Sequence, residues 1–411
     1  MNPKQLERGS GKASAGFTAV GLKLIMRGML FSNVRGISRQ VAGTVAGVMA
    51  MFTVLAGCAQ PSRATPKVQQ PRLARTIVLP GVRATRPEVG VLGRLDHLAY
   101  DPATKRLFVA ALENGSLEVL DLETGQRVRS ISGLSRPQGA AVVPTQDCVA
   151  VACGGDGLLR VYDTRSLAEK KIIEVGSDAD NVRYDAQADT VWVSYGSTNG
   201  GAIATYEPRA WKRRGELRFN SRPESFQLDP TGGRLFANLP KSVRAVEAGA
   251  VAVASRTQGR IKTLIPLPGR ARNFPMAFDA THARLFIATR LPARLIAIDT
   301  RHGRVVSEAP CTDDSDDLFY DAQTDRVLVI GGGFRPDLQE PGTASPCSPP
   351  GGVGGIDVFA VGANGDLKRL STTPTAPHAR TGLFVPSRRT LYLAVPFRGE
   401  REAEIREYRI E

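Results

Sequence analysis

The feature that most limits how this 411-residue chain can fold is a repeat of roughly 40 to 45 residues. Each copy has a short hydrophobic run, a turn that begins with Asp or Pro, and a second hydrophobic run such as RLFVAA or RLFIAT. The turns begin at Asp101, Pro144, Asp185, Asp229, Asp279, Asp321 and Pro386. Two further extended segments follow in most copies. Four strands in a repeat of this length are typical of one blade of a β-propeller.

The sequence therefore predicts an all-β fold, a seven-bladed β-propeller with four-stranded blades, over residues 73–411. The last copy supplies only three strands before the chain ends at Glu411. Residues 75–83, RTIVLPGVR, precede the first copy and are predicted to supply the missing outer strand beside residues 403–410. Closure by this N-terminal strand would remove the exposed sheet edges that favour aggregation.

Two of the copies, RLFVAALENGSLEVLDLETGQRV and RLFIATRLPARLIAIDTRHGRVV, resemble YVTN-type repeats of the YncE-like propeller family. The resemblance covers about residues 75–411. It implies a propeller fold and an exported protein. Members of that family have no common assigned activity, so the resemblance implies no particular reaction.

The first 57 residues have the pattern of a secretory signal. Basic residues lead into an uncharged stretch, VAGTVAGVMAMFTVLAG, which ends at Cys58. The four residues LAGC resemble a bacterial lipobox, in which the cysteine carries the lipid. We expect a signal peptide at 1–57, lipid attachment at Cys58 and an extended tether at 58–72. The alternative is a transmembrane anchor, for which the stretch is at the short limit.

These features predict a cell-envelope protein held to a membrane through its N-terminal lipid. Ala59 follows the cysteine, and by resemblance to enterobacterial lipoproteins this favours the outer membrane, with the propeller facing the periplasm. Without residues 1–57 the chain keeps 47 basic and 39 acidic residues, a net charge of +8. Nucleic-acid binding would require a basic face with interleaved aromatic residues, and neither this moderate charge nor the envelope location predicts it. We expect a monomer.

Residues 331–355, GGGFRPDLQEPGTASPCSPPGGVGG, interrupt the sixth copy between its second and third strands. So much Gly and Pro predicts irregular structure, either a surface insertion without order or a loop that covers one face of the propeller. Cys347 lies in this insertion and Cys311 ends the fifth copy. An oxidising periplasm would allow these two residues to form a disulfide.

Functional residues are expected where the innermost strands enter the central channel. Counting five positions back from each turn residue gives Asp96, Gly139, Asp180, Glu224, Phe274, Asp316 and Thr381. Their polar neighbours are His97, Gln138, Asn181, Ser225, Asn273, Asp317 and Arg380. Because equivalent positions of the blades lie at equivalent heights around the axis, these residues are predicted to form one ring at one mouth of the channel. The types differ from blade to blade, as expected of an asymmetric ligand site.

Two groups within this ring suggest chemistry. The candidates for a polar ligand or for Ca²⁺ or Mg²⁺, which take oxygen ligands, are Asp180, Asn181, Glu224, Asn273, Asp316 and Asp317. Their arrangement resembles, in position only, the axial metal site of the gluconolactonase and regucalcin propellers. A second arc of possible acid, base and cation comprises Asp96, His97, His378 and Arg380. The alternative is that the acids only accept hydrogen bonds from free backbone amides.

Three classes of function remain open at this point. The first is a lipid-anchored envelope propeller that binds a small polar ligand or an envelope protein. The second is a metal-dependent, lactonase-like hydrolase with an axial site. The third is a quinone-cofactor dehydrogenase, which is disfavoured because only Trp192 and Trp211 are available to stack against a cofactor.

Overall fold

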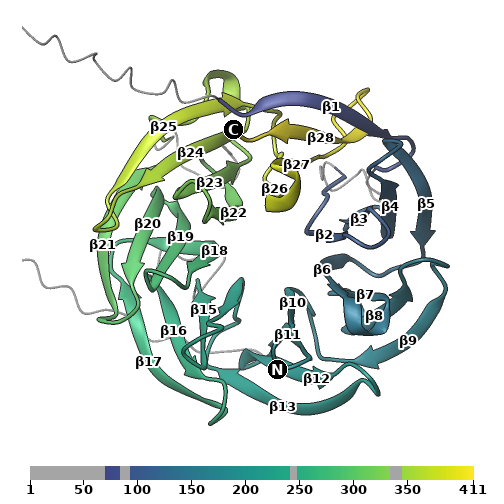
Figure 1. Cartoon of the computed structure of the whole chain (residues 1–411), viewed down its shortest axis with the longest axis horizontal. Helices are drawn as coiled ribbons and strands as arrows, with labels where there is room; N and C mark the ends of the chain where they lie inside the picture. The colour runs from purple at the N-terminus through teal and green to yellow at the C-terminus, as the bar shows by residue number, and fades with distance from the viewer. Residues whose placement is uncertain (1–69, 84–92, 241–247, 334–344) are drawn as a thin grey trace, which may run out of the picture. The chain divides into compact units, whose positions relative to one another are not determined.

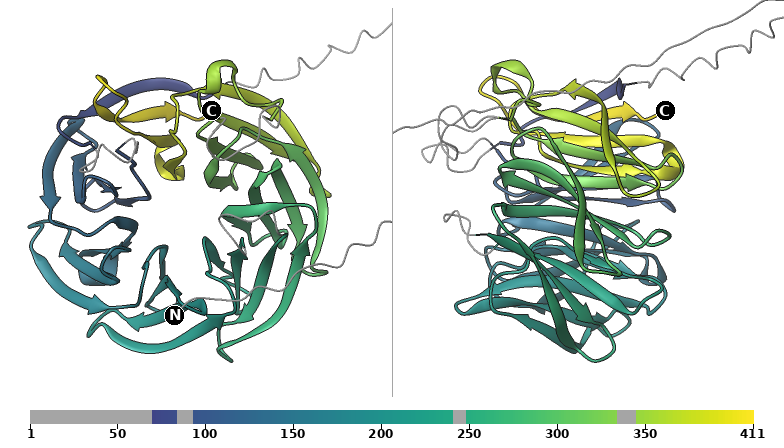
Figure 2. Two further views of the ribbon diagram at one scale, coloured as in Figure 1. Left: turned by 180° about the vertical axis from the view of Figure 1, so that it is seen from behind. Right: turned by 90° about the vertical axis from the view of Figure 1, so that its left-hand side faces the viewer.

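The structure, a computed structural model, describes residues 70–83, 93–240, 248–333 and 345–411, all within the unit Ala64–Glu411. Its strands form seven four-stranded antiparallel sheets, arranged as blades around a central axis (Figure 1). Figure 2 shows the same ring from behind and from the side. The predicted seven-bladed, all-β propeller is confirmed. The predicted signal peptide, Cys58 and residues 58–69 of the tether lie outside the described residues.

Within each blade the strands are ordered from the axis to the rim. Blade one comprises β2 (Leu98–Asp101), β3 (Arg106–Ala111), β4 (Ser116–Asp121) and β5 (Gln126–Ser132). Blade two comprises β6 (Pro137–Val143), β7 (Cys148–Cys153), β8 (Leu158–Asp163) and β9 (Glu169–Glu174). Blade three comprises β10 (Val182–Asp185), β11 (Thr190–Ser197), β12 (Gly200–Glu207) and β13 (Lys212–Phe219). Blade four comprises β14 (Phe226–Leu228), β15 (Arg234–Leu239), β16 (Gly249–Ser255) and β17 (Arg260–Leu267). Blade five comprises β18 (Ala271–Asp279), β19 (Arg284–Leu291), β20 (Ala293–Asp299) and β21 (Arg304–Pro310).

Blade six comprises β22 (Ser315–Asp321), β23 (Arg326–Gly331), β24 (Gly355–Val361) and β25 (Leu367–Pro374). Blade seven joins β26 (Thr381–Val385), β27 (Thr390–Val395) and β28 (Ala403–Arg409) to the N-terminal strand β1 (Arg72–Leu79). β1 pairs with β28 in antiparallel register, from Leu79 opposite Ala403 to Arg72 opposite Arg409 (Figure 1). The predicted closure by the N-terminal strand is therefore confirmed, with the strand beginning three residues earlier than expected.

The apolar core is divided among the contacts between blades. The buried hydrophobic residues of the described chain form seven clusters, and each cluster joins two neighbouring blades. Ile77 and Leu79 of β1 belong to the cluster between blades seven and one. Closure by β1 therefore buries apolar surface as well as pairing a sheet edge.

The turn after each innermost strand explains why Asp or Pro recurs there. Asp101 accepts hydrogen bonds from the backbone N of Ala103 at 3.0 Å and from the Thr104 hydroxyl at 2.6 Å. The other four aspartates make the same kind of turn with the residues that follow them. In blades two and seven, Pro144 and Pro386 instead begin short 3₁₀ turns, for which the fixed φ of proline is suited. Both solutions reverse the chain tightly at one end of the channel.

The described part of the blade-six insertion is attached to blade six. Ser345 donates from its backbone N to Asp313 at 2.7 Å and from its hydroxyl to the carbonyl of Cys311 at 2.6 Å. A 3₁₀ turn follows at Pro350–Gly352. The prediction of irregular structure therefore holds for residues 345–354, and residues 334–344 lie outside the described part.

The four cysteines in the described ranges are free thiols. Burial raises the pKa of the Cys311 thiol well above its usual value, and the nearby Cys347 adds to this rise. The two thiols are neighbours but are not bonded in this structure, so the predicted disulfide stays a prediction for oxidising conditions. In the ranges that the structure describes, no helix has the length and apolar character needed to cross a membrane.

Candidate functional site

The loops that lead into the innermost strands bring a layer of charged residues to one mouth of the channel. Five of these loops contain a non-glycine residue in the left-handed region, with φ between 52° and 62°: Arg136, Asp178, Arg272, Asp314 and His378. That conformation costs on the order of 1 kcal/mol for such residues. Gly93 takes the corresponding conformation in blade one, with φ of 52°. The same sharp bend thus sets the direction of the residues that follow it in six blades.

Blades five to seven contribute the most tightly paired part of the ring. Asp316 lies between two arginines, with the Arg290 guanidinium at 2.6 Å and the Arg380 Nε at 2.9 Å. Asp314 contacts the same two arginines, at 3.2 and 2.8 Å respectively. Burial opposes ionisation of Asp316, but the arginines hold the pKa of its carboxyl below the usual range. These four side chains form a largely buried, charge-balanced group.

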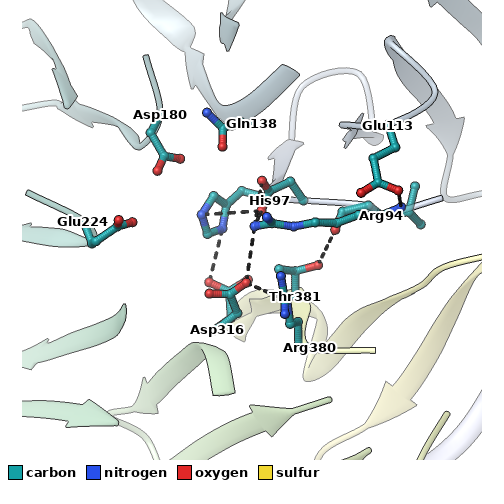
Figure 3. A network of polar contacts seen from close by, with 12 residues as sticks. Arg94, His97, Glu113, Gln138, Asp180, Glu224, Asp316, Arg380 and Thr381 are labelled. Atoms are coloured by element: carbon teal, nitrogen blue, oxygen red, sulfur yellow. Dashed lines mark hydrogen bonds and ion pairs between the residues drawn. The ribbon is translucent and has the colours of Figure 1, made fainter. Parts of the chain in front are cut away.

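Blade one adds a second pair of cations to this group (Figure 3). Arg94 reaches across to Asp316 at 3.5 Å and also contacts Asp96 at 3.2 Å. The Nδ1 of His97 lies 3.3 Å from Asp317, whose other oxygen accepts a hydrogen bond from the backbone N of Gly382. Burial alone would lower the pKa of His97, but the carboxylate of Asp317, helped by Asp96, raises it to about 10. His97 is therefore an imidazolium at neutral pH.

Blades three and four contribute an acidic arc on the other side of the ring, where Asp180 and Glu224 point toward the axis (Figure 3). Arg222 connects the acids of this arc, contacting Asp178, Asp180 at 2.8 Å and Glu224 at 3.6 Å. The side-chain amide of Gln138 in blade two donates to Asp178 at 3.2 Å. The arc therefore holds three carboxyls around one guanidinium.

This excess of carboxyls shifts their protonation. Burial raises the pKa of Glu224, and although Arg222 opposes the shift, Asp180 and Asp316 help to raise it to about 8. Burial also raises the pKa of Asp180, with Arg222 opposing and Asp96 adding to the rise. Protons or a ligand's positive groups would relieve the repulsion between these acids. On one side of the mouth the carboxylates are thus balanced by arginines, and on the other side the carboxyls outnumber the single guanidinium of Arg222.

The ring opens into an axial cavity of about 560 Å³. His97, Arg183, Ser225 and Asp317 line it near the charged mouth. The rest of its wall is mostly apolar, from side chains on the innermost strands and the turns that follow them, and includes Ala99, Tyr100, Val142, Tyr184, Ala277, Phe278, Phe319, Tyr320 and Phe384. A volume of this size is typical of small-molecule sites.

The structure brings most of the predicted ring together and separates some of its members. Asp96, His97, Asp180, Glu224, Asp316, Asp317 and Arg380 all belong to one electrostatic network. Asn181 is buried beside them, and its side-chain oxygen has no hydrogen-bond partner in the described structure. Asn273 lies between blades four and five, where its amide donates to Asn238 at 2.9 Å and to the carbonyl of Ala250. His378 packs against Gly332 of blade six, and its backbone N donates to the Gly332 carbonyl at 2.8 Å.

Sequence reasoning missed the residues two positions before the ring. Arg94, Asp178, Arg222 and Asp314 each precede a ring acid by two residues. In an extended segment, residues two apart lie on the same side, so this alternation was a signal that could have found them. Arg290 comes from β19 instead, and it covers the Phe274 ring at 4.1 Å. Because Arg290 lies in the second strand of its blade, counting positions along the innermost strands could not identify it.

The ring acids do not fit a divalent cation as they are arranged. In the described ranges, no group of three or more potential metal ligands comes together. Arg290 and Arg380 occupy the oxygens of Asp314 and Asp316, and Arg222 occupies those of Asp178 and Asp180. A Ca²⁺ or Mg²⁺ ion would need several of these oxygens at once. Binding of such an ion stays a prediction.

Comparison with known proteins supports the fold and leaves the family open. No protein-family model and no curated protein matches the sequence. Among solved structures, a chain of the hydrazine synthase of Kuenenia stuttgartiensis is similar with a TM-score of 0.61 and 15% identity, over 74% of this chain and 93% of that one. A chain of a mitotic checkpoint complex is similar with a TM-score of 0.62 and 13% identity, over 89% and 99%. At such identities the likeness shows the propeller fold alone.

Proposed function

We propose that this chain is a lipid-anchored binding propeller of the cell envelope, which takes a small polar ligand at the charged mouth of its axial channel. The observation that carries the proposal is the asymmetric ring. Carboxyls and guanidiniums from blades one and three to seven meet at one mouth of an axial cavity of about 560 Å³. A frame made of seven similar blades needs no such variety, whereas recognition of one ligand in one orientation does.

The mouth is suited to binding because its charges are fixed before a ligand arrives. Asp316 and Asp314 are locked by two arginines each, and the positions of Arg94 and His97 are set by carboxyls. A ligand would therefore not pay for ordering these side chains. The acidic arc, with Glu224 and Asp180, would favour a positive or hydrogen-bond-donating group on the same ligand.

Binding can be tested with thermal unfolding in the presence of a panel of cationic, anionic, zwitterionic and neutral small molecules. We expect at least one compound to raise the melting temperature of the parent protein. The double variant Asp180→Asn/Glu224→Gln should lose that shift for compounds that use the acidic arc. A control double variant at two exposed acids, Asp366→Asn/Glu400→Gln, should keep it. Failure of every compound to shift the parent would contradict the proposal.

The envelope location rests on the LAGC pattern at Leu55–Cys58 and on the resemblance to YncE-like exported propellers. We propose attachment through the Cys58 lipid, in the outer membrane and facing the periplasm. The variant Cys58→Ser should move the protein from the membrane to the soluble periplasmic fraction. Its retention in washed membranes would contradict lipid anchoring and leave the binding proposal standing.

The two enzyme hypotheses receive less support from the site. The quinone hypothesis relied on a tryptophan to stack against the cofactor, and neither tryptophan lines the axial cavity: Trp192 packs between blades three and four, and Trp211 packs against the cluster between blades two and three. A lactonase-like hydrolase would need a metal among acids that arginines already hold. Glu224, with its raised pKa of about 8, is the residue that would serve as general acid or base in such an enzyme.

A further inference from the structure

Arg183 differs from the other arginines around the channel. It belongs to β10, one of the innermost strands, and lines the axial cavity. Arg94, Arg222, Arg290 and Arg380 each have at least one carboxylate within 4 Å. No carboxylate of the described chain lies within 4 Å of the Arg183 guanidinium, and its hydrogen-bond partners are neutral groups.

Those contacts leave much of its guanidinium unused. One terminal nitrogen donates to the carbonyl of Val182 at 3.0 Å, and the other reaches the Ser225 hydroxyl at 3.5 Å. The Phe226 ring lies 5.8 Å away. A guanidinium offers five N–H donors in a planar fork, so several remain for a ligand. Burial lowers the pKa of Arg183, and the carboxylates of Asp317 and Asp180 oppose that shift only from a distance.

The charge of the cavity wall favours an anion. Its carboxylic acids and strong bases are His97, Arg183 and Asp317. Because Asp317 is paired with the protonated His97, these two charges balance. The charge of Arg183 is therefore offset only from a distance, by Asp317 and Asp180, and an anion placed directly beside it would be favoured.

The wall beyond Arg183 favours an apolar body on the same ligand. The hydroxyl of Tyr184 donates to Asp189 at 2.8 Å, and that of Tyr320 donates to Asp325 at 2.6 Å. With these hydroxyls engaged, the rings offer chiefly apolar surface to the cavity, together with Phe278, Phe319 and Phe384. Among the described residues that line it, the cavity thus combines the partly unused guanidinium of Arg183 with aromatic side chains.

We infer that the axial channel binds an organic anion, whose carboxylate pairs with the guanidinium of Arg183 and whose apolar part lies against the aromatic wall. This inference rests on the proposed function and names the ligand class for it. A carboxylate suits the site because its two oxygens match the planar fork of arginine. The Ser225 hydroxyl stands beside the fork as a further hydrogen-bond partner.

The test uses two probes of nearly the same shape, benzoate and benzamide, which differ in charge. Titration calorimetry or ligand-observed NMR with the purified full-length protein should show benzoate binding at least tenfold more tightly than benzamide. The variant Arg183→Gln should remove this preference, and Arg183→Lys should keep part of it because the charge stays while the fork is lost. The control Arg129→Gln, at an exposed position of β5, should leave it unchanged.

Equal binding of the two probes, binding of neither, or a benzoate preference that survives Arg183→Gln would each overturn the inference. The variant Arg183→Gln should unfold at the same temperature as the parent or higher, since it removes a charge that has no carboxylate beside it. A melting temperature measured in this range would show that a loss of the benzoate preference is not caused by misfolding. If benzoate fails while a cationic compound shifts the melting temperature through Asp180 and Glu224, the proposed function stands and this inference alone is wrong.

Discussion

The two ends of the innermost strands follow different rules. At the turn end, five blades use the same aspartate turn and two use a proline turn. At the other end, the equivalent positions carry Asp96, Gly139, Asp180, Glu224, Phe274, Asp316 and Thr381. The turn is made with only two residue types in seven blades, whereas the equivalent positions at the mouth carry five types, with Asp in three blades. The repeated end builds the frame, and the varied end is where binding is expected.

The largest effect on the frame should come from breaking the ring itself. Deleting residues 72–79 would remove β1, leave the edge of β28 unpaired and expose the cluster that contains Ile77 and Leu79. We expect aggregation or loss of cooperative unfolding, measured by light scattering and circular dichroism. Deleting residues 59–66 serves as the length-matched control. A soluble variant that melts within a few degrees of the parent would show that β1 does not hold the ring closed.

A smaller effect should follow from removing one turn aspartate. Asp229 is buried, accepts backbone hydrogen bonds from Thr231 at 3.0 Å and Gly232 at 2.9 Å, and pairs with Arg234 at 2.8 Å. Asp229→Ala should lower the free energy of unfolding by about 3 kcal/mol, since these groups lose their partner. Denaturant titration would measure it. Ser387→Ala, at an exposed turn position of blade seven, should change little.

The smallest change in stability is expected at the mouth, and it should depend on pH. The raised pKa of Glu224, about 8, means that the folded state holds this proton more tightly than the unfolded state. Its contribution to stability is complete below pH of about 4.5 and is lost as the pH rises through 8. Relative to Glu224→Gln, the parent should therefore lose stability over this range, by up to about 1.4 kcal/mol per pH unit. Glu400→Gln should follow the parent, and a pH profile of Glu224→Gln that matches the parent's would refute the shift.

The sequence predicted the frame well because the frame is local and repeated. Each turn aspartate bonds residues two or three positions away, so its role could be recognised in every copy. Closure followed from counting strands in the last copy. The ring positions were also found by counting, because equivalent residues of similar blades lie at equivalent heights.

The parts of the site that escaped prediction depend on contacts between blades. Arg290 reaches Asp314 and Asp316 from a second strand of the neighbouring blade. Asn273 was expected in the ring, but the register of β18 shifts between Asn273 and Met276, and the side chain lies between blades instead. That no described carboxylate lies within 4 Å of Arg183 could not be seen in the sequence, since the acids that act on it from farther away, Asp180 and Asp317, come from a loop and from another strand. Such pairings are set by the assembled ring.

The most direct test of the difference between frame and mouth compares variants in these two regions. For each variant, two quantities are measured: the melting temperature without ligand, and the rise of that temperature when a ligand is added. We expect Asp229→Ala to lower the melting temperature by about 5 °C and to keep the shift. We expect Asp180→Asn/Glu224→Gln to leave the melting temperature unchanged or higher and to lose the shift given by a cationic or zwitterionic compound. If the double variant instead unfolds readily and no compound stabilises the parent, the ring acids belong to the frame and the central claim is contradicted.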